Sequence, residues 1–132
     1  MNNIVGLGND IINITRIEKS IAKFGDKFIN KLYTPKEILL AGKFGSKQKL
    51  YSFYAKRFAA KEALVKAIGT GFSKDISFKD IEILNNEQGK PIVYTYNKLN
   101  TLLKHHLIHI SLSDDYPFAM ATILVSSSYR PM

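Results

Sequence analysis

The 132-residue chain contains no cysteine, which excludes disulfide bonds and cysteine-ligated zinc sites. A chain without cysteine is compatible with a reducing compartment, and we expect the protein to be cytoplasmic. The chain also lacks a basic segment followed by an apolar run at its start, and no run approaches about 18 apolar residues. We therefore expect neither a signal peptide nor a membrane span. Repeats and long linkers are absent too, so residues 1–132 are expected to form a single domain.

Acidic residues are scarce relative to basic ones, with eleven Asp and Glu against nineteen Lys and Arg, a net charge of +8. Such a balance favours anionic partners, which include nucleic acids, anionic lipids, phosphorylated small molecules and acidic proteins. A small nucleic-acid-binding module is the main alternative to an enzyme. We find no nucleic-acid-binding motif, and the aromatic residues are placed for a core rather than an exposed stacking platform, so no nucleic-acid partner is expected.

Hydrophobic periodicity predicts a mixed α+β fold in which a long central helix packs on an antiparallel sheet. The longest helical pattern is apolar around much of its circumference, which is typical of a helix buried in the middle of a fold. The sequence predicts helices over residues 14–32 (broken near Gly25), 35–42, 47–68 and 97–105, and strands over residues 3–11, 81–84, 91–96, 109–113 and 118–125.

The first predicted strand carries two glycines and an acid at alternate positions, Gly6, Gly8 and Asp10. Glycine within a strand indicates a bulge or a close approach of another backbone. A lone acid at a strand end is usually a turn former or a helix cap. Paired with Glu62, however, Asp10 would supply the few carboxylates that Mg²⁺ takes from a protein when waters and phosphates complete its shell.

The long helix carries Glu62 and Lys66 four residues apart, just before the turn formed by Gly69, Thr70 and Gly71. Spacing alone favours an ordinary surface ion pair, which contributes little to stability. The setting favours a functional role, because few other positions of this helix are polar and the glycine-rich turn could admit a phosphate.

The strand His109-Ile110-Ser111-Leu112-Ser113 places one histidine and two serines on the same face. This arrangement raises the alternative of a hydrolase. The alternative is disfavoured because the chain has no Gly-x-Ser-x-Gly nucleophile elbow.

Basic residues recur about every four positions along the first predicted helix. If the helix is continuous, they form a stripe along one side, which suits a charged partner or is simply a solvated face. The stripe comprises Arg16, Lys19, Lys23, Lys27 and Lys31.

Taken together, these segments resemble the bacterial holo-acyl-carrier-protein synthase family, a group of 4′-phosphopantetheinyl transferases. The resemblance covers nearly the whole chain, with five segments in the family's order and spacing. These segments are residues 6–11 with Arg16-Ile17, residues 57–63 with Lys66-Ala67, residues 69–71, residues 89–91 and residues 109–113.

The resemblance implies a Mg²⁺-dependent enzyme that moves the phosphopantetheine arm of coenzyme A onto a serine of apo acyl carrier protein, releases 3′,5′-ADP and supports fatty acid biosynthesis. It implies a homotrimer with active sites between subunits. It also implies roles for particular residues, among them Arg16 as a contact to the acidic carrier protein. The basic stripe adds Lys19 and Lys23 to this contact. The implied metal ligands are Asp10 and Glu62, the catalytic residues Glu62 and Lys66, and the coenzyme A contacts Arg57, Lys66, Gly69, Thr70 and His109.

The group that accepts the serine proton stays open at this point. Some family members have a second histidine after the strand that carries His109, whereas this chain has Asp114. The candidates are a metal-bound water, Asp114 and Glu37. Phosphoryl transfer depends more on positioning and charge stabilisation than on covalent chemistry, so the family's reaction is compatible with these residues.

Overall fold

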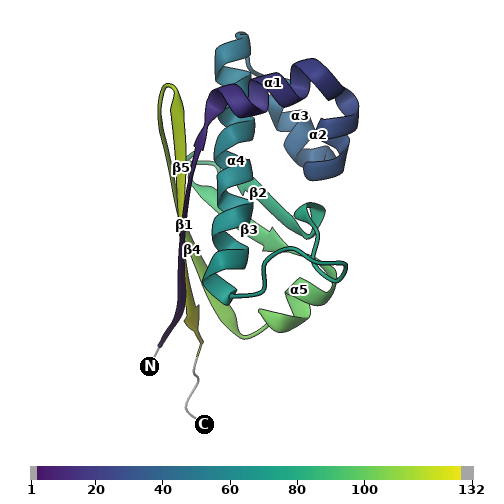
Figure 1. Ribbon diagram of the computed structural model, residues 1–132. Helices are drawn as coiled ribbons and strands as arrows, with labels where there is room; N and C mark the ends of the chain where they lie inside the picture. The colour runs from purple at the N-terminus through teal and green to yellow at the C-terminus, as the bar shows by residue number, and fades with distance from the viewer. Residues whose placement is uncertain (1–2, 129–132) are drawn as a thin grey trace.

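The computed structural model describes residues 3–128 and places one long helix between a sheet and a second layer of smaller elements (Figure 1). The predicted mixture of helices and antiparallel strands is confirmed. In chain order the elements are β1 (Ile4–Asn13), α1 (Ile14–Phe24), α2 (Asp26–Leu32), α3 (Pro35–Ala41), α4 (Lys47–Ile68), the 3₁₀ helix η1 (Phe78–Asp80), β2 (Ile81–Asn85), β3 (Pro91–Thr95), α5 (Asn97–Leu102), β4 (His106–Asp115) and β5 (Phe118–Ser127).

Helix α4 is delimited by clear capping residues at both ends. The Ser46 hydroxyl accepts a hydrogen bond from the backbone N–H of Lys49 at 3.2 Å, which satisfies one of the free donors of the first turn. Gly69 ends the helix in the left-handed conformation, with φ of 76°, as the sequence predicted. Between these caps most side chains are buried, because β1 and β5 cover one side of α4 and the smaller elements cover the other.

The main sheet has the strand order β1-β5-β4, and both pairings are antiparallel. Its inner face, which packs on α4, carries small and β-branched residues such as Ala119, Ala121 and Ile123. The register places Asp10 opposite Ala121 and therefore on this inner face. Side chains at the intervening positions point away from α4, and Figure 1 shows no element of residues 3–128 covering that outer face.

The two glycines of β1 allow this strand to lie directly against the backbone of α4. A Cβ atom added at Gly6 would overlap the carbonyl oxygen of Ala67, and one added at Gly8 would overlap the carbonyl oxygen of Ala63. The close approach predicted for this segment is confirmed, and a register irregularity lies between Ile4 and Gly6 as well. The contact brings Asp10 close to the last turns of α4.

We expect Gly8→Ala to lower the free energy of unfolding by about 3 kcal/mol or more, because a backbone carbonyl cannot rotate away from the added methyl group. Gly45→Ala is the matched control, since nothing lies within 4 Å of a Cβ added at Gly45. That variant should stay within about 1 kcal/mol of the parent protein. Urea unfolding at one fixed protein concentration measures both, and equal effects would contradict a close contact at Gly8.

The first predicted helix is two helices, because Gly25 adopts φ of 57° and turns the chain between α1 and α2. The break predicted near Gly25 is confirmed, so the condition for one continuous basic stripe over residues 16–31 is not met. Arg16, Lys19 and Lys23 lie on α1, whereas the last two lysines of the series lie on α2. A glycine at this position lets the chain change direction at little steric cost.

On the side of α4 opposite the sheet, α3 begins with the capping box that the sequence predicts. The Thr34 N–H donates to the Glu37 carboxylate at 3.0 Å, and the Glu37 N–H donates to the Thr34 hydroxyl at 3.3 Å. The hairpin of β2 and β3 packs beside it, with Ile83 opposite Val93. None of the helices formed by the described residues is both long and apolar enough to cross a membrane.

Candidate active site

Two carboxylates and a lysine lie together where β1 passes the C-terminal half of α4. The Nζ atom of Lys66 lies 2.8 Å from Oδ1 of Asp10 and 3.3 Å from the carbonyl oxygen of Asn9. The sequence had left open a surface ion pair between Glu62 and Lys66. Among residues 3–128, Lys66 is paired with Asp10 instead. The lysine side chain is 54% exposed and that of Asp10 is 17% exposed, so solvent reaches this cluster.

The charges of this cluster act on each other. Burial raises the pKa of Glu62 above its ordinary value and the charge of Asp10 raises it further, while Lys66 and Arg16 oppose the shift. The pKa of Lys66 is raised because its ammonium group donates a hydrogen bond to Asp10 and is attracted by both carboxylates. Glu62 thus bears a negative charge that its two cationic neighbours only partly compensate, and an additional cation would be favoured there.

The donor set fits a hard divalent cation such as Mg²⁺. Asp10 comes from β1 and Glu62 from α4, so two separate elements supply carboxylate oxygens to one place. Within the described part of the chain there is no group of three or more His, Cys, Asp and Glu residues that could enclose a metal ion. A site with only two carboxylates suits Mg²⁺, which keeps several waters and takes its remaining ligands from substrate phosphates. It does not suit zinc, which prefers closed nitrogen and sulfur sites.

The turn that follows α4 does not offer free backbone amides to a phosphate. The N–H of Gly69 donates to the carbonyl oxygen of Lys66 at 3.1 Å. The N–H groups of Thr70 and Gly71 donate to the carbonyl oxygen of Val65 at 3.1 and 3.3 Å. The carboxyl end of a helix also carries partial negative charge, which repels anions. The backbone N–H groups of Gly69, Thr70 and Gly71 are therefore engaged within the chain, and the Thr70 hydroxyl is the polar side chain that this turn could offer to a phosphate. The contacts of Gly69 and Thr70 with coenzyme A stay predictions.

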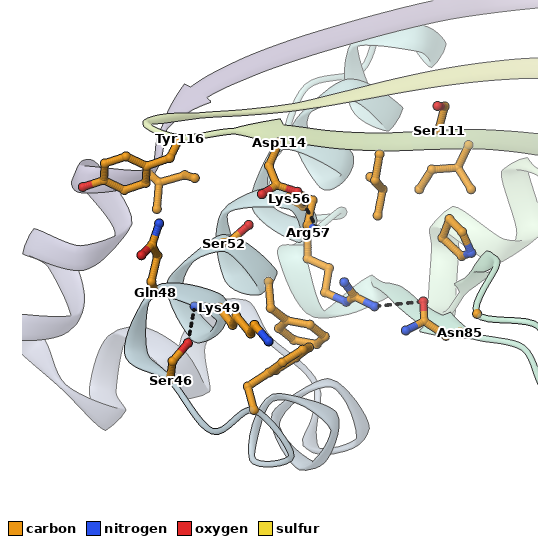
Figure 2. Close-up of a pocket in the computed structure, with 17 residues that line it drawn as sticks. Ser46, Gln48, Lys49, Ser52, Lys56, Arg57, Asn85, Ser111, Asp114 and Tyr116 are labelled. Carbon is orange, nitrogen blue, oxygen red and sulfur yellow. Dashed lines mark hydrogen bonds and ion pairs between the residues drawn. The ribbon is translucent and has the colours of Figure 1, made fainter.

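A cavity of about 720 Å³ opens on the other side of α4, between its N-terminal half and the strands β2 and β4. Figure 2 shows Arg57 extending from α4 toward Asn85, while Lys56 of the same helix meets Asp114 of β4. Lys49 also lines the cavity, so three cationic side chains surround it. Such a lining suits a ligand that carries phosphates.

Arg57 is held firmly although it lines a cavity. Its Nε donates to the carbonyl of Ile83 at 3.0 Å and one terminal nitrogen donates to Asn85 at 3.4 Å. The guanidinium carbon lies 3.8 Å from the centroid of the Phe53 ring. Burial lowers the pKa of Arg57 to about 10, although the charge of Glu37 and the nearby Tyr33 oppose this shift. The group is therefore still cationic at neutral pH.

His109 lies on the outer face of the main sheet, away from α4. Its register partner is Leu124 of β5, and its Nε2 is 3.3 Å from the hydroxyl of Ser126. Residues on this face alternate with the half-buried residues Ile108 and Ile110 of the inner face. His109 is therefore separated from Asp10 by the thickness of the sheet.

Within one chain, the residues proposed for catalysis and for coenzyme A binding lie in three separate places. Asp10, Glu62 and Lys66 form one cluster, Arg57 lines the cavity, and His109 lies on the outer face of the sheet. Five residues separate Arg57 from Glu62 on the same helix, a rotation of about 140° around its axis. The structure of one chain does not bring these residues together.

The structure also narrows the choice of proton acceptor. Glu37 is completely buried, and its two oxygens accept hydrogen bonds from Lys61, from the Thr34 amide and from the Ile83 amide. It is therefore a structural group and is wrong as a candidate base. Burial raises the pKa of Asp114, but the ion pair with Lys56 at 3.0 Å outweighs this effect and holds the pKa below its usual value. That shift weakens Asp114 as a base.

The sequence pattern did not indicate the other polar side chains around the cavity. Lys49, Lys56 and Asn85 belong to segments that looked like ordinary helix surface or turn. Their only sequence signal is that Lys56 and Arg57 are adjacent on the most apolar helix. The cavity joins residues far apart in sequence, and the pattern of one segment cannot reveal such a grouping.

The basic residues of α1 adjoin the carboxylate cluster. The charge of Arg16 acts on the pKa of Glu62, and Lys19 and Lys23 are exposed on the same helix. Lys23 Nζ lies 5.2 Å from the centroid of the Phe24 ring. The cationic surface of α1 thus begins beside the carboxylates and extends away from them.

Comparison with known proteins identifies the class to which this fold and site belong. The sequence profile described as the 4′-phosphopantetheinyl transferase superfamily matches residues 6–121. The chain belongs to this superfamily. Its similarity to relatives extends over nearly the full length of both chains.

Curated relatives are named holo-[acyl-carrier-protein] synthase. The protein of Wolbachia pipientis subsp. Culex pipiens is 48% identical over 92% of this chain and 97% of that protein. A crystal structure of such a synthase from Bacillus anthracis in complex with CoA (3′,5′-ADP) has a TM-score of 0.81 and 42% identity, covering 95% of this chain and 98% of that one. The Helicobacter pylori synthase in complex with coenzyme A has a TM-score of 0.79 and 33% identity, with 90% and 98% covered.

Proposed function

We propose that this chain is a holo-acyl-carrier-protein synthase, which transfers 4′-phosphopantetheine from coenzyme A to a serine of apo acyl carrier protein and thereby serves fatty acid biosynthesis. The observation that carries the proposal is the solvent-accessible cluster of Asp10, Glu62 and Lys66 beside a cationic helix. In the reaction the serine hydroxyl gives up its proton to water or a base, its oxygen bonds to the β-phosphorus of coenzyme A, the bond from that phosphorus to the bridging oxygen breaks, and 3′,5′-ADP leaves. A reducing cytoplasm is the compartment we propose for this chemistry.

Asp10 and Glu62 would hold Mg²⁺, which supplies charge neutralisation at the pyrophosphate. Lys66 contributes a further positive charge, and its ammonium group can donate hydrogen bonds to phosphate oxygens once it is released from Asp10. Because phosphoryl transfer requires mostly alignment and electrostatic stabilisation, these residues act by binding and orienting the phosphates.

Mass spectrometry of an apo carrier protein incubated with the enzyme, coenzyme A and Mg²⁺ tests the proposal directly. The expected result is a carrier protein heavier by one phosphopantetheine group, together with free 3′,5′-ADP. A carrier protein of unchanged mass, under conditions in which a known synthase modifies it, would overturn the proposal.

We further propose that the enzyme is a homotrimer whose active sites are completed between neighbouring chains. The outer face of the main sheet is exposed and apolar, with Leu7 65% and Ile11 57% accessible, and Val5 and Met120 beside them. A monomer rarely leaves such a continuous apolar face in water. His109 lies on this face, so association there would bring a residue of the coenzyme A site into a subunit interface.

Charge reversal of Arg16 and Lys23 should raise the KM for the carrier protein about tenfold at low salt, because exposed charges steer an acidic partner by long-range attraction. The KM for coenzyme A should change little. The difference from the parent enzyme should shrink as ionic strength rises, since salt screens the attraction that the parent enzyme has and the variant lacks.

Lys104→Glu is the control, because Lys104 is equally exposed but follows α5, far from α1 (Figure 1). It should leave the carrier KM unchanged. If the double reversal on α1 gave the parent KM at low salt, that surface would be an ordinary solvated face.

A further inference from the structure

A buried ion pair connects four elements, α2, α3, α4 and β2. The ammonium group of Lys61, on α4, donates to the carboxylate of Glu37, on α3, at 2.7 Å and to the carbonyl of Leu32 at 2.7 Å. The second oxygen of Glu37 accepts from the N–H of Ile83, on β2, at 2.9 Å. The exposed fraction of both charged residues is 0%, which is unusual for Lys and Glu.

This ion pair is part of a closed ring of contacts that also includes Arg57. The carbonyl oxygen of Ile83 accepts from Nε of Arg57 at 3.0 Å, while the N–H of the same residue is held by Glu37. Arg57 and Lys61 are one helical turn apart on α4, so the helix itself closes the ring between these two residues. Each member fixes the position of the next.

The ring restricts the part of Arg57 that would otherwise be free to rotate. Arginine has several rotatable bonds, and a ligand loses affinity when it must order such a side chain. Here the bond to Ile83 and the stacking on Phe53 together define the plane of the guanidinium group. A ligand in the cavity therefore meets a cation that is already oriented.

Stability alone does not account for a buried charge pair at this place. Removing two charges from water is costly, and apolar side chains of similar size often serve a fold equally well. What apolar side chains cannot do is accept a hydrogen bond from the Ile83 amide. The capping box of α3 does not require Lys61 either, since Thr34 alone provides its partners.

We propose that Glu37 and Lys61 are positioning residues, which hold Ile83 of β2 against α4 and thereby fix the orientation of Arg57 for a phosphate of coenzyme A. This inference rests on the proposed function only in taking coenzyme A as the ligand of the cavity. Neither residue touches the ligand, so their effect should appear in its binding and not in the carrier interaction.

The test uses the double variant Glu37→Leu/Lys61→Met, which removes both charges together and leaves neither one buried alone. Isothermal titration with 3′,5′-ADP should show affinity reduced about tenfold relative to the parent enzyme. The KM for coenzyme A should rise by a similar factor and the KM for the carrier protein should stay the same. Nitrogen-15 NMR should show faster solvent exchange of the Arg57 Nε–H.

Two further variants separate positioning from general damage. Tyr96→Phe removes the 2.6 Å hydrogen bond from Tyr96 to Glu82, a buried acid beside the ring but outside it. It should leave the 3′,5′-ADP affinity unchanged. Adding Arg57→Met to the double variant should cause no further loss beyond Arg57→Met alone, because the ring acts through this arginine.

The outcomes are distinguishable. If the parent enzyme does not bind 3′,5′-ADP, the proposed function fails. If the parent enzyme binds it and the folded double variant binds it equally well, only the positioning role fails. If the double variant does not fold, Glu37→Gln serves instead. Lys61 and the Ile83 amide bond to different oxygens of Glu37, and glutamine replaces one of these oxygens by an NH2 group that cannot accept. The affinity of Glu37→Gln for 3′,5′-ADP should therefore still fall, and parental affinity would overturn the inference.

Discussion

Replacing Glu62 by glutamine should reduce phosphopantetheine transfer by roughly a hundredfold or more, because each tenfold loss requires only about 1.4 kcal/mol of lost charge stabilisation. The change keeps the size of the side chain and removes one of the two carboxylates offered to the metal. Rates measured across a Mg²⁺ titration should stay low throughout. A near-parental rate at any Mg²⁺ concentration would show that Glu62 is not a metal ligand.

Although Glu62→Gln should lose activity, its stability should be equal to or slightly above that of the parent enzyme. The pKa of Glu62 is raised in the folded protein, so its charged form is disfavoured there relative to the unfolded chain. The folded state therefore loses stability as pH rises through this titration, and an uncharged glutamine avoids the loss. At neutral pH we expect a melting temperature equal to or slightly above that of the parent enzyme.

Asp10→Asn completes the comparison, with Asp75→Asn as its matched control. Asp10 pairs with Lys66 at 2.8 Å, and Asp75 pairs with Lys98 at 3.2 Å, both with lysines more than half exposed. Asp10→Asn should abolish transfer, whereas Asp75→Asn should have no effect on it. The difference would assign the loss to the metal site and not to a missing surface ion pair.

Local rules predicted the elements that surround the site. The capping box at Thr34 and the terminating Gly69 are decided by the chemistry of a few adjacent residues, and the structure confirms both. The glycine pair of β1 predicted a close backbone approach, which is found against α4. These features could be predicted because their causes lie within one segment.

The polar partners could not be predicted in the same way. Helical spacing offered Lys66 one partner, Glu62 on its own helix, whereas the packing of β1 against α4 pairs Lys66 with Asp10. Glu37 was identified correctly as part of a capping box, but its second role depends on Lys61, which is 24 positions away. Burial of both charges follows from tertiary packing, which the hydrophobic periodicity of the sequence does not indicate.

Sequence motifs do not show which residues of one chain lie in the same active site. Motifs are read along the chain, and Arg57 and Glu62 fall within one motif of α4. Their side chains nevertheless leave the helix in directions about 140° apart, so they cannot hold the same part of one small ligand. Association of chains would resolve this, because one subunit can supply the first residue and its neighbour the second.

We therefore expect Leu7→Asp to yield a monomer that is folded but inactive. The side chain is 65% exposed on the outer face of the main sheet, so an isolated chain tolerates a charge there, whereas an apolar interface does not. Leu39→Asp is the control, since Leu39 is 73% exposed on α3, away from the sheet. Sedimentation equilibrium and circular dichroism should show a folded monomer for the first variant only. A fully active monomer at assay concentration would contradict the proposed trimer.

Complementation between two inactive variants tests the shared site more directly than loss of assembly. Suppose that Glu62→Gln removes the metal site and Arg57→Met removes the phosphate contact of the neighbouring chain. Each variant alone should be inactive. Co-expressed in equal amounts, they should recover about a quarter of the parental rate, because a random assembly places an intact Glu62 opposite an intact Arg57 at one interface in four. If both residues serve a site within the same chain, no mixed assembly contains an intact site and the rate stays at background.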